Sequence, residues 1–173
     1  MEKSHKVYLP KITTFIFDVD GVLTNSQMLV DPNGELLRSV NVKDGFAIKL
    51  ALSKGYKVGI ISKGTNKAIE QRFIDFGLTE VYFGVQQKVP YLEDFIKKHK
   101  VSLEEIAYMG DDLADVPVLK KVGMSCAPQD AVREVLQVSN YISDKKGGET
   151  CVRDIIEQVM RVRGDWPRLE ELV

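Results

Sequence analysis

The stretch that decides the fold is Thr13-Thr14-Phe15-Ile16-Phe17, followed directly by Asp18-Val19-Asp20-Gly21-Val22-Leu23-Thr24. The first part is β-branched, aromatic and too short for a helix, so it predicts a buried strand. Two carboxylates, Asp18 and Asp20, then stand two residues apart at the end of that strand. Negative charges at the edge of a core are costly unless a cation, hydrogen bonds or a shared proton compensates them. A divalent cation with oxygen ligands meets that need, and a turn with solvated carboxylates is the plain structural alternative.

Similar apolar runs recur along the chain and are separated by helical patterns. We expect strands at 56–61, 80–83, 106–109 and 124–127, with a short edge strand at 141–142. The most pronounced helical pattern between or after them consists of Val152, Ile155, Ile156, Val159 and Met160. This alternation predicts an α/β fold, a doubly wound, Rossmann-like parallel sheet with helices on both faces, in a single domain over 1–173.

One segment, at about 26–42, interrupts the alternation. It places Asp31-Pro32-Asn33-Gly34 between two short apolar stretches, which is typical of a β-hairpin. Because this insert follows the first strand, we expect it to project as a flap from the carboxyl edge of the sheet, where ligands bind in such folds. The intervals 18–62 and 88–111 leave no room for a separate cap domain.

Composition narrows the class of protein. The 173 residues carry 24 Lys and Arg against 25 Asp and Glu, for a net charge of -1. This balance gives no broad basic field, so we expect neither a nucleic acid nor a membrane as partner. No signal peptide is visible, no apolar run approaches the roughly 20 residues of a membrane span, and two cysteines suit a reduced setting. We therefore expect a cytoplasmic protein.

Polar side chains follow three further predicted strands. Ser62 and the backbone N–H groups after it form a ready anion site, although a helix cap is the structural alternative. Lys88 follows the strand at 80–83 and, taken alone, is a solvated lysine. Gly110-Asp111-Asp112-Leu113-Ala114-Asp115 follows the strand at 106–109 and, taken alone, is a loop with a helix cap. Since parallel strands end at one edge, the combination predicts a single site.

In this order the motifs resemble those of the haloacid dehalogenase-like phosphohydrolase superfamily. The resemblance implies that Asp18 is the nucleophile and Asp20 the general acid/base. It also implies that Ser62 and Lys88 hold the transferring phosphoryl group, and that Asp18, Asp20 and Asp111 bind Mg²⁺. A carboxylate can accept a phosphoryl group covalently, which divides one hard displacement into two easier ones.

Within the superfamily, the chain resembles the capless branch of 3-deoxy-D-manno-octulosonate 8-phosphate phosphatases. The matching segments are FDVDGVLT at 17–24, PNGE at 32–35, NVKDG at 41–45, GDDLAD at 110–115 and KGGE at 146–149. The resemblance implies hydrolysis of this acidic sugar phosphate, in lipopolysaccharide precursor synthesis, by a homotetramer whose hairpins form a central barrel. The residues that it implies in substrate binding are Asp20, Asn41, Val42, Lys43, Asp44, Gly45, Lys49, Gly64, Arg72 and Lys88.

Other residues are secondary candidates. Lys63 adds a charge near the phosphate or the sugar acid, and Asp112 and Asp115 accompany the predicted metal ligand. The resemblance further implies that a neighbour's tail, at about 145–173, closes the site. The candidate lid residues in that tail are Gly147, Gly148 and Arg153. Glu149-Thr150 after the two glycines departs from the family's Gly-Gly-x-Gly pattern.

Several alternatives stay open. The segment 41–45 also suits a simple helix start, Arg72 a surface arginine, and the glycine pair a flexible loop. A nine-carbon acid, 2-keto-3-deoxynononate 9-phosphate, is the nearest alternative substrate. An oligomerisation module, related to tail domains of nucleotide-sugar synthetases, is the alternative of another class. A phosphomutase would need a lid to exclude water, and the sequence has no such insertion.

Overall fold

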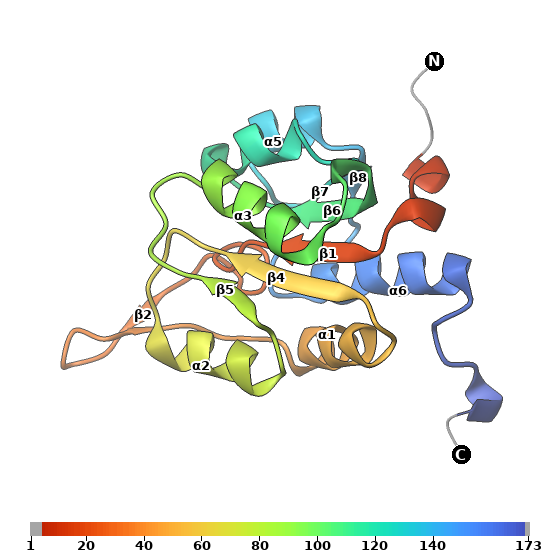
Figure 1. The fold of residues 1–173 in the computed structure, drawn as a ribbon. Helices are drawn as coiled ribbons and strands as arrows, with labels where there is room; N and C mark the ends of the chain where they lie inside the picture. The colour runs from red at the N-terminus through yellow and green to blue at the C-terminus, as the bar shows by residue number, and fades with distance from the viewer. Residues whose placement is uncertain (1–4, 172–173) are drawn as a thin grey trace.

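Strand β1 (Thr14–Phe17) lies at the centre of the molecule, and its four side chains are all buried. A short β-branched and aromatic run suits this position because helices cover a parallel sheet on both faces. In the computed structural model, which describes residues 5–171, five further strands join β1 in one sheet (Figure 1). These strands are β4 (Lys57–Ile61), β5 (Glu80–Tyr82), β6 (Ile106–Met109), β7 (Met124–Ala127) and β8 (Tyr141–Ile142).

The strand order is β5-β4-β1-β6-β7-β8, and every neighbouring pair is parallel. Thr14 pairs with Lys57 of β4 on one side and with Ile106 of β6 on the other, so these three strands end at the same edge. The chain turns to opposite sides of the sheet about β1, which makes this edge a topological switch point. The predicted doubly wound α/β fold is confirmed, with β1, β4 and β5 each one residue shorter than expected.

Two layers of helices cover the sheet. Phe15 and Phe17 face one core together with α1, α2 and α6, whereas Ile16 faces a second core with α3, α4 and α5. The helices are α1 (Val42–Ser53), α2 (Lys67–Asp75), α3 (Val89–His99), α4 (Val116–Leu119), α5 (Arg133–Val138) and α6 (Cys151–Arg163). Short 3₁₀ turns occur at His5–Val7, Leu9–Lys11, Leu103–Glu105, Leu113–Asp115 and Leu169–Glu171. Within residues 5–171, no helix combines the length and apolarity that crossing a membrane requires.

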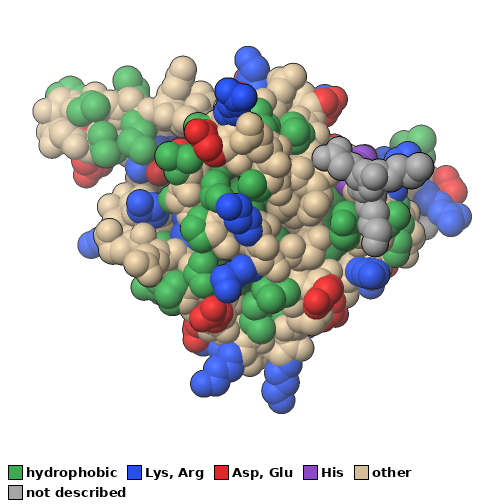
Figure 2. Space-filling view, turned by 90° about the horizontal axis from the view of Figure 1, so that it is seen from above, with side chains coloured by type: hydrophobic (Ala, Val, Ile, Leu, Met, Phe, Trp, Pro, Cys, Tyr) green, Lys and Arg blue, Asp and Glu red, His purple; other side chains and the backbone are tan. Residues whose placement is uncertain are grey.

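The predicted hairpin is present as β2 (Leu29–Val30) and β3 (Leu36–Leu37), which pair in antiparallel fashion apart from the main sheet. Its turn forms because Asp31 Oδ1 accepts the N–H groups of Asn33 at 2.8 Å and Glu35 at 2.7 Å. We call residues 26–40 the flap. It projects to the left in Figure 1, and apolar side chains gather on this arm in Figure 2. The exposed apolar residues of the flap are Met28, Leu29, Val30, Leu36 and Leu37.

The glycine pair in the tail contacts its own chain. A Cβ at Gly147 would lie 2.1 Å from the carbonyl oxygen of Gly21, and the N–H of Gly148 donates to the Val22 carbonyl at 2.9 Å. Both glycines therefore pack against the loop after β1 of their own chain. The expected lid on a neighbour stays a prediction. The rest of the described tail is largely α6, which packs against α1. Residues 1–4 and 172–173 of the predicted domain lie outside the described residues.

Candidate active site

A cavity of about 220 Å³ lies at the carboxyl ends of β1, β4 and β6. Strand tips, rather than one continuous segment, supply its polar groups, because the parallel register brings these tips to one edge. The cavity is lined by Asp18, Asp20, Ser26, Ser62, Lys63, Gly64, Lys88, Asp111, Asp112 and Ala114. The structure thus brings together the residues that sequence motifs placed after four different strands.

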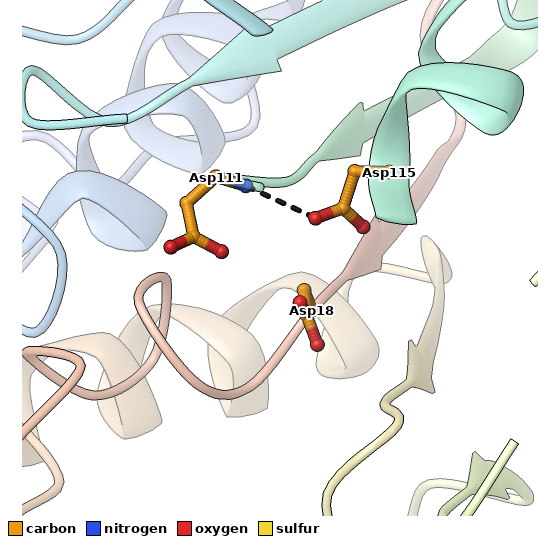
Figure 3. Close-up of side chains that lie close together, drawn as sticks. All are labelled: Asp18, Asp111 and Asp115. Atoms are coloured by element: carbon orange, nitrogen blue, oxygen red, sulfur yellow. Dashed lines mark hydrogen bonds between the residues drawn. The ribbon is translucent and has the colours of Figure 1, made fainter. Parts of the chain in front are cut away.

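Three carboxylates, from Asp18, Asp111 and Asp115, lie close together (Figure 3), and two of them, Asp18 and Asp111, line the cavity. Each offers an oxygen, and these atoms lie within 4.8 Å of one another. The Lys88 ammonium joins two of them, at 2.7 Å from Asp18 Oδ2 and 2.6 Å from Asp115 Oδ1. Lys88 is only 3% exposed, so it is a buried partner of the acidic cluster and not a solvated loop lysine.

Asp115 organises the loop after β6. Its Oδ1 also accepts the Tyr108 hydroxyl at 2.5 Å, and its Oδ2 accepts the N–H groups of Asp111 at 3.2 Å and Asp112 at 3.3 Å. With Asp112 it forms the capping box of the 3₁₀ turn Leu113–Asp115, so the helix-cap interpretation of this motif also holds. Sequence reasoning did not identify Tyr108, since a tyrosine inside a buried strand resembles an ordinary core residue.

The acidic cluster carries more negative charge than Lys88 can neutralise. Burial, followed by the charges of Asp18 and Asp115, raises the pKa of Asp111 to about 8. Burial and then Asp115 raise the pKa of Asp18 as well. Burial alone would lower the pKa of Lys88, but the two adjacent carboxylates raise it above its usual value.

A divalent cation fits this charge distribution. Asp111 Oδ1 is buried without a hydrogen-bond partner among the described residues, which suits an oxygen available for coordination. Hard cations such as Mg²⁺ take carboxylate oxygens, and a local excess of negative charge favours them. Gly21 allows the close approach, because a Cβ there would lie 1.9 Å from Asp111 Oδ2.

Asp20, which we expected to contribute to the metal site, has its carboxylate paired elsewhere. Arg38 Nε donates to Oδ1 at 2.6 Å and Nη2 donates to Oδ2 at 3.2 Å. The Asp20 side chain is therefore not a member of the acidic cluster. Sequence reasoning missed Arg38, since a single arginine just after a short hairpin strand carries no motif and resembles a solvated surface charge.

Ser62 is 1% exposed and lines the cavity. Its Oγ accepts the Gly64 N–H at 3.2 Å. The cap of α2 is Asn66 instead, whose Oδ1 accepts the Ile69 N–H at 3.0 Å. The alternative interpretation of Ser62 as the helix cap is therefore wrong. Ser62 does not cap α2, and it lines the cavity together with Lys63.

The segment 41–45 lies outside the cavity and starts α1. Asn41 Oδ1 accepts the Lys43 N–H at 2.9 Å, and Asn41 Nδ2 donates to the Gly148 carbonyl at 3.1 Å. Asp44 is 1% exposed, and its Oδ1 accepts the Arg153 N–H at 2.7 Å. These contacts give Asn41 and Asp44 structural roles in a single subunit.

The remaining predicted substrate contacts line two separate surface grooves. One groove runs between α1 and α2, with Phe76 beneath two cations. Its lining includes Val42, Gly45, Lys49 and Arg72. The other contains Lys43 and Arg153 beside Trp166. Within one chain, none of these residues lines the cavity that holds Asp18.

The chain belongs to the haloacid dehalogenase-like hydrolase family. The model of that family matches residues 61–153, more than half of the 173 residues. The expected family is thereby confirmed.

Among members of that family, the chain is similar to 3-deoxy-D-manno-octulosonate 8-phosphate phosphatases. The enzyme KdsC of Escherichia coli strain K12 is 36% identical over 153 residues, which cover 88% of this chain and 81% of that protein. The structure of the phosphatase from Yersinia pestis matches with a TM-score of 0.90 at 30% identity, over 94% of this chain and 87% of that one. The structure from Moraxella catarrhalis, in complex with magnesium, phosphate and KDO, matches with a TM-score of 0.86 at 26% identity, over 93% and 92% of the two chains.

Proposed function

We propose that this protein is a Mg²⁺-dependent phosphomonoesterase that hydrolyses 3-deoxy-D-manno-octulosonate 8-phosphate to the free sugar acid and phosphate, in lipopolysaccharide precursor synthesis. The observation that carries the proposal is the strand-tip carboxylate Asp18, which faces Asp111 and contacts the buried Lys88 inside a polar cavity. Relatives with this activity, which share about a third of the residues over most of the chain, support the same reaction.

In the proposed reaction, an Asp18 oxygen attacks the substrate phosphorus and forms an aspartyl phosphate. Asp20 gives a proton to the leaving alkoxide. It then takes a proton from the water that attacks the same phosphorus, which releases phosphate and restores the Asp18 carboxylate. Lys88, the Ser62 hydroxyl and nearby backbone N–H groups hold the phosphoryl oxygens.

Asp18 and Asp111 are the residues proposed to hold Mg²⁺. When bound, the ion neutralises charge on the phosphoryl oxygens and reduces repulsion between the Asp18 carboxylate and an anionic substrate. Asp115 keeps Lys88 and the loop after β6 in place, through its contacts with both.

The oligomer and the cellular compartment are further parts of the proposal. We propose a homotetramer joined through the flap, because its two strands expose apolar side chains and unpaired edges. In such an assembly, Lys49 and Arg72 are available to a neighbour's substrate, since neither has a carboxylate partner among the described ion pairs. We propose a cytoplasmic location, which agrees with two buried and unpaired cysteines.

A phosphate-release assay tests the proposed activity. The assay compares the eight-carbon and nine-carbon keto-acid phosphates with simple hexose phosphates, in the presence of Mg²⁺. We expect the eight-carbon acid to have the highest kcat/KM. A preference for the nine-carbon acid would change the substrate, a preference for hexose phosphates would overturn the substrate class, and absence of turnover would favour an oligomerisation module.

The variant Asp18→Asn tests the nucleophile in the same assay. It removes a negative oxygen while retaining side-chain size, so we expect the fold to persist and Mg²⁺-dependent phosphate release to disappear. Thermal melting and circular dichroism check the fold. Substantial turnover in this variant would contradict the assignment of Asp18.

A further inference from the structure

We propose that Arg38 is a positioning residue, which holds the Asp20 carboxylate in its working orientation and couples the flap to the catalytic loop. This inference rests on the proposed function, in which Asp20 transfers protons. In this role, Arg38 contacts the acid/base Asp20 and does not itself contact the substrate.

The contact between Arg38 and Asp20 has the geometry of a specific ion pair. Two guanidinium nitrogens donate to the two carboxylate oxygens, at 2.6 Å and 3.2 Å. The Arg38 side chain is only 4% exposed, whereas that of Asp20 is 26% exposed. A bidentate pair fixes both the position and the plane of a carboxylate, which a single hydrogen bond does not. Asp20 is thus constrained from the flap side while part of it still faces the cavity.

A second set of contacts fixes the flap to the loop after β4. The Leu36 carbonyl accepts both Arg38 Nη1 and Asn66 Nδ2, each at 3.2 Å. Asn66 also caps α2, so this carbonyl connects the flap with the segment that follows Ser62. The segment of the flap that contains β3 and Arg38 is therefore fixed both to Asp20 after β1 and to Asn66 after β4.

Gly64 completes the arrangement. A Cβ at this position would lie 2.5 Å from Asp20 Oδ2 and 3.4 Å from Arg38 Nη2. Only a residue without a side chain leaves room for the ion pair in its present place. The close approach links the anion-binding loop, the acid/base and the flap in one packed unit.

Direct substrate binding by Arg38 is the competing interpretation, and three observations oppose it. Arg38 is not among the residues that line the cavity. Each of its three guanidinium nitrogens already donates one hydrogen bond, to the Asp20 carboxylate or to the Leu36 carbonyl. Its buried side chain would have to leave both partners in order to reach a phosphate.

The experiment uses 4-nitrophenyl phosphate in rapid-mixing kinetics. Nitrophenolate leaves without a proton, so formation of the aspartyl phosphate on Asp18 does not need Asp20, whereas its hydrolysis by water does. In Arg38→Met we expect the first turnover to stay within about threefold of the wild type and steady-state turnover to fall about 10- to 100-fold. A burst of nitrophenolate would therefore appear. Arg38→Lys, which keeps the charge without the two-pronged geometry, should give an intermediate effect.

A double-mutant cycle with Asp20→Asn decides how Arg38 acts. If Arg38 works only through Asp20, Arg38→Met should change the Asp20→Asn enzyme by less than about twofold. A further loss in that background, an increased KM with unchanged kcat, or equal loss of both kinetic phases would overturn the inference.

Arg161→Met is the matched control, because Arg161 forms an exposed ion pair with Glu157 at 2.6 Å, outside the site. Both phases should persist in this variant. If circular dichroism shows that Arg38→Met does not fold, the same double-mutant cycle is measured with Arg38→Lys, and it decides whether Arg38 acts through Asp20. Absence of Asp18-dependent nitrophenolate release in the wild type would instead contradict the proposed function itself.

Discussion

At the level of single residues, the candidate site depends on glycines as much as on charged groups. A Cβ at Gly110 would lie 2.2 Å from Asp115 Cγ, just as one at Gly21 would displace Asp111. Carboxylates approach backbone atoms closely in this site, and that approach is possible only where no side chain intervenes. The acidic cluster and the Arg38–Asp20 pair are both formed in this way.

The variant Gly64→Ala tests this dependence. The added methyl would overlap Asp20 Oδ2, so we expect the ion pair with Arg38 to shift and kcat to fall about tenfold or more. The global fold should persist, because the overlapping atoms belong to side chains. Turnover and melting temperature measured on the same sample check both expectations.

Gly55→Ala is the contrasting variant. Gly55 has a φ of +85° and open space around its missing side chain, so alanine there adds backbone strain without a clash. We expect a loss of about 1 to 2 kcal/mol in the free energy of unfolding, with unchanged kcat. If Gly64→Ala reduced stability but not kcat, the proposed role of its close contact would be wrong.

At the level of elements, α1 and α6 are joined by a buried carboxylate. The N-cap residue of α6, Thr150, makes no side-chain capping hydrogen bond, and Asp44 from α1 accepts the Arg153 N–H instead. Asp44 Oδ2 is buried and lacks a hydrogen-bond partner among the described residues. Burial, the largest cause, raises the pKa of Asp44 to about 6, in spite of hydrogen bonds from the start of α6. Asp44 therefore stabilises the start of α6 at the cost of burying its own negative charge.

This arrangement predicts a pH-dependent stability. Because the folded-state pKa of Asp44 lies above its ordinary value of 3.8, its contribution favours folding below pH 4 and is lost as the pH rises through about 6. Relative to Asp44→Asn, the wild type should lose about 1 kcal/mol of unfolding free energy between pH 5 and pH 7.5. Urea unfolding of both proteins at the two pH values measures this difference. A constant difference between the two proteins would contradict the prediction.

At the scale of the whole molecule, the metal site and the flap are two surfaces that a single chain leaves incomplete. The carboxylates of Asp18, Asp111 and Asp115 carry more negative charge than the Lys88 ammonium neutralises, and the flap exposes apolar side chains that its own chain does not cover. A cation would complete the first surface, and copies of the same chain would complete the second.

Mg²⁺ should stabilise the folded protein even without substrate. At a Mg²⁺ concentration about 100 times its dissociation constant, linkage predicts about 2.7 kcal/mol, or a rise of roughly 5 to 10 °C in melting temperature. EDTA should reverse the rise. Asp111→Asn should remove it, because the variant lacks a proposed ligand. An equal Mg²⁺ response in wild type and variant would place the cation elsewhere.

The flap should determine the oligomeric state. Leu29 and Leu37 pair with each other across the hairpin and are 70% and 46% exposed, so replacing both by glutamate should leave the isolated chain folded. We expect sedimentation analysis to show a tetramer for the wild type and a monomer for this double variant. Val162→Glu, at an exposed apolar position of α6, is the control and should stay tetrameric. A monomeric wild type, or a tetrameric double variant, would contradict assembly through the flap.

The amino-acid sequence by itself determined the layered sheet, the flap and the strand-tip motifs, because they depend on local patterns. Apolar periodicity defined β1 and β6, the Asp31–Gly34 turn defined the hairpin, and each candidate site residue lay in the segment after a strand. Parallel pairing then brings such strand ends together.

Only the tertiary structure decided which side chains meet across those motifs. Arg38 and Asp20 are 18 residues apart, and Asp44 and Arg153 are 109 residues apart, so no local pattern announces either contact. The tertiary structure likewise placed Lys49 and Arg72 in the groove between α1 and α2, and not in the cavity of the same chain. The physical reason is that periodicity reports the environment of a residue's own element, whereas ion pairs, caps and grooves depend on how distant elements pack.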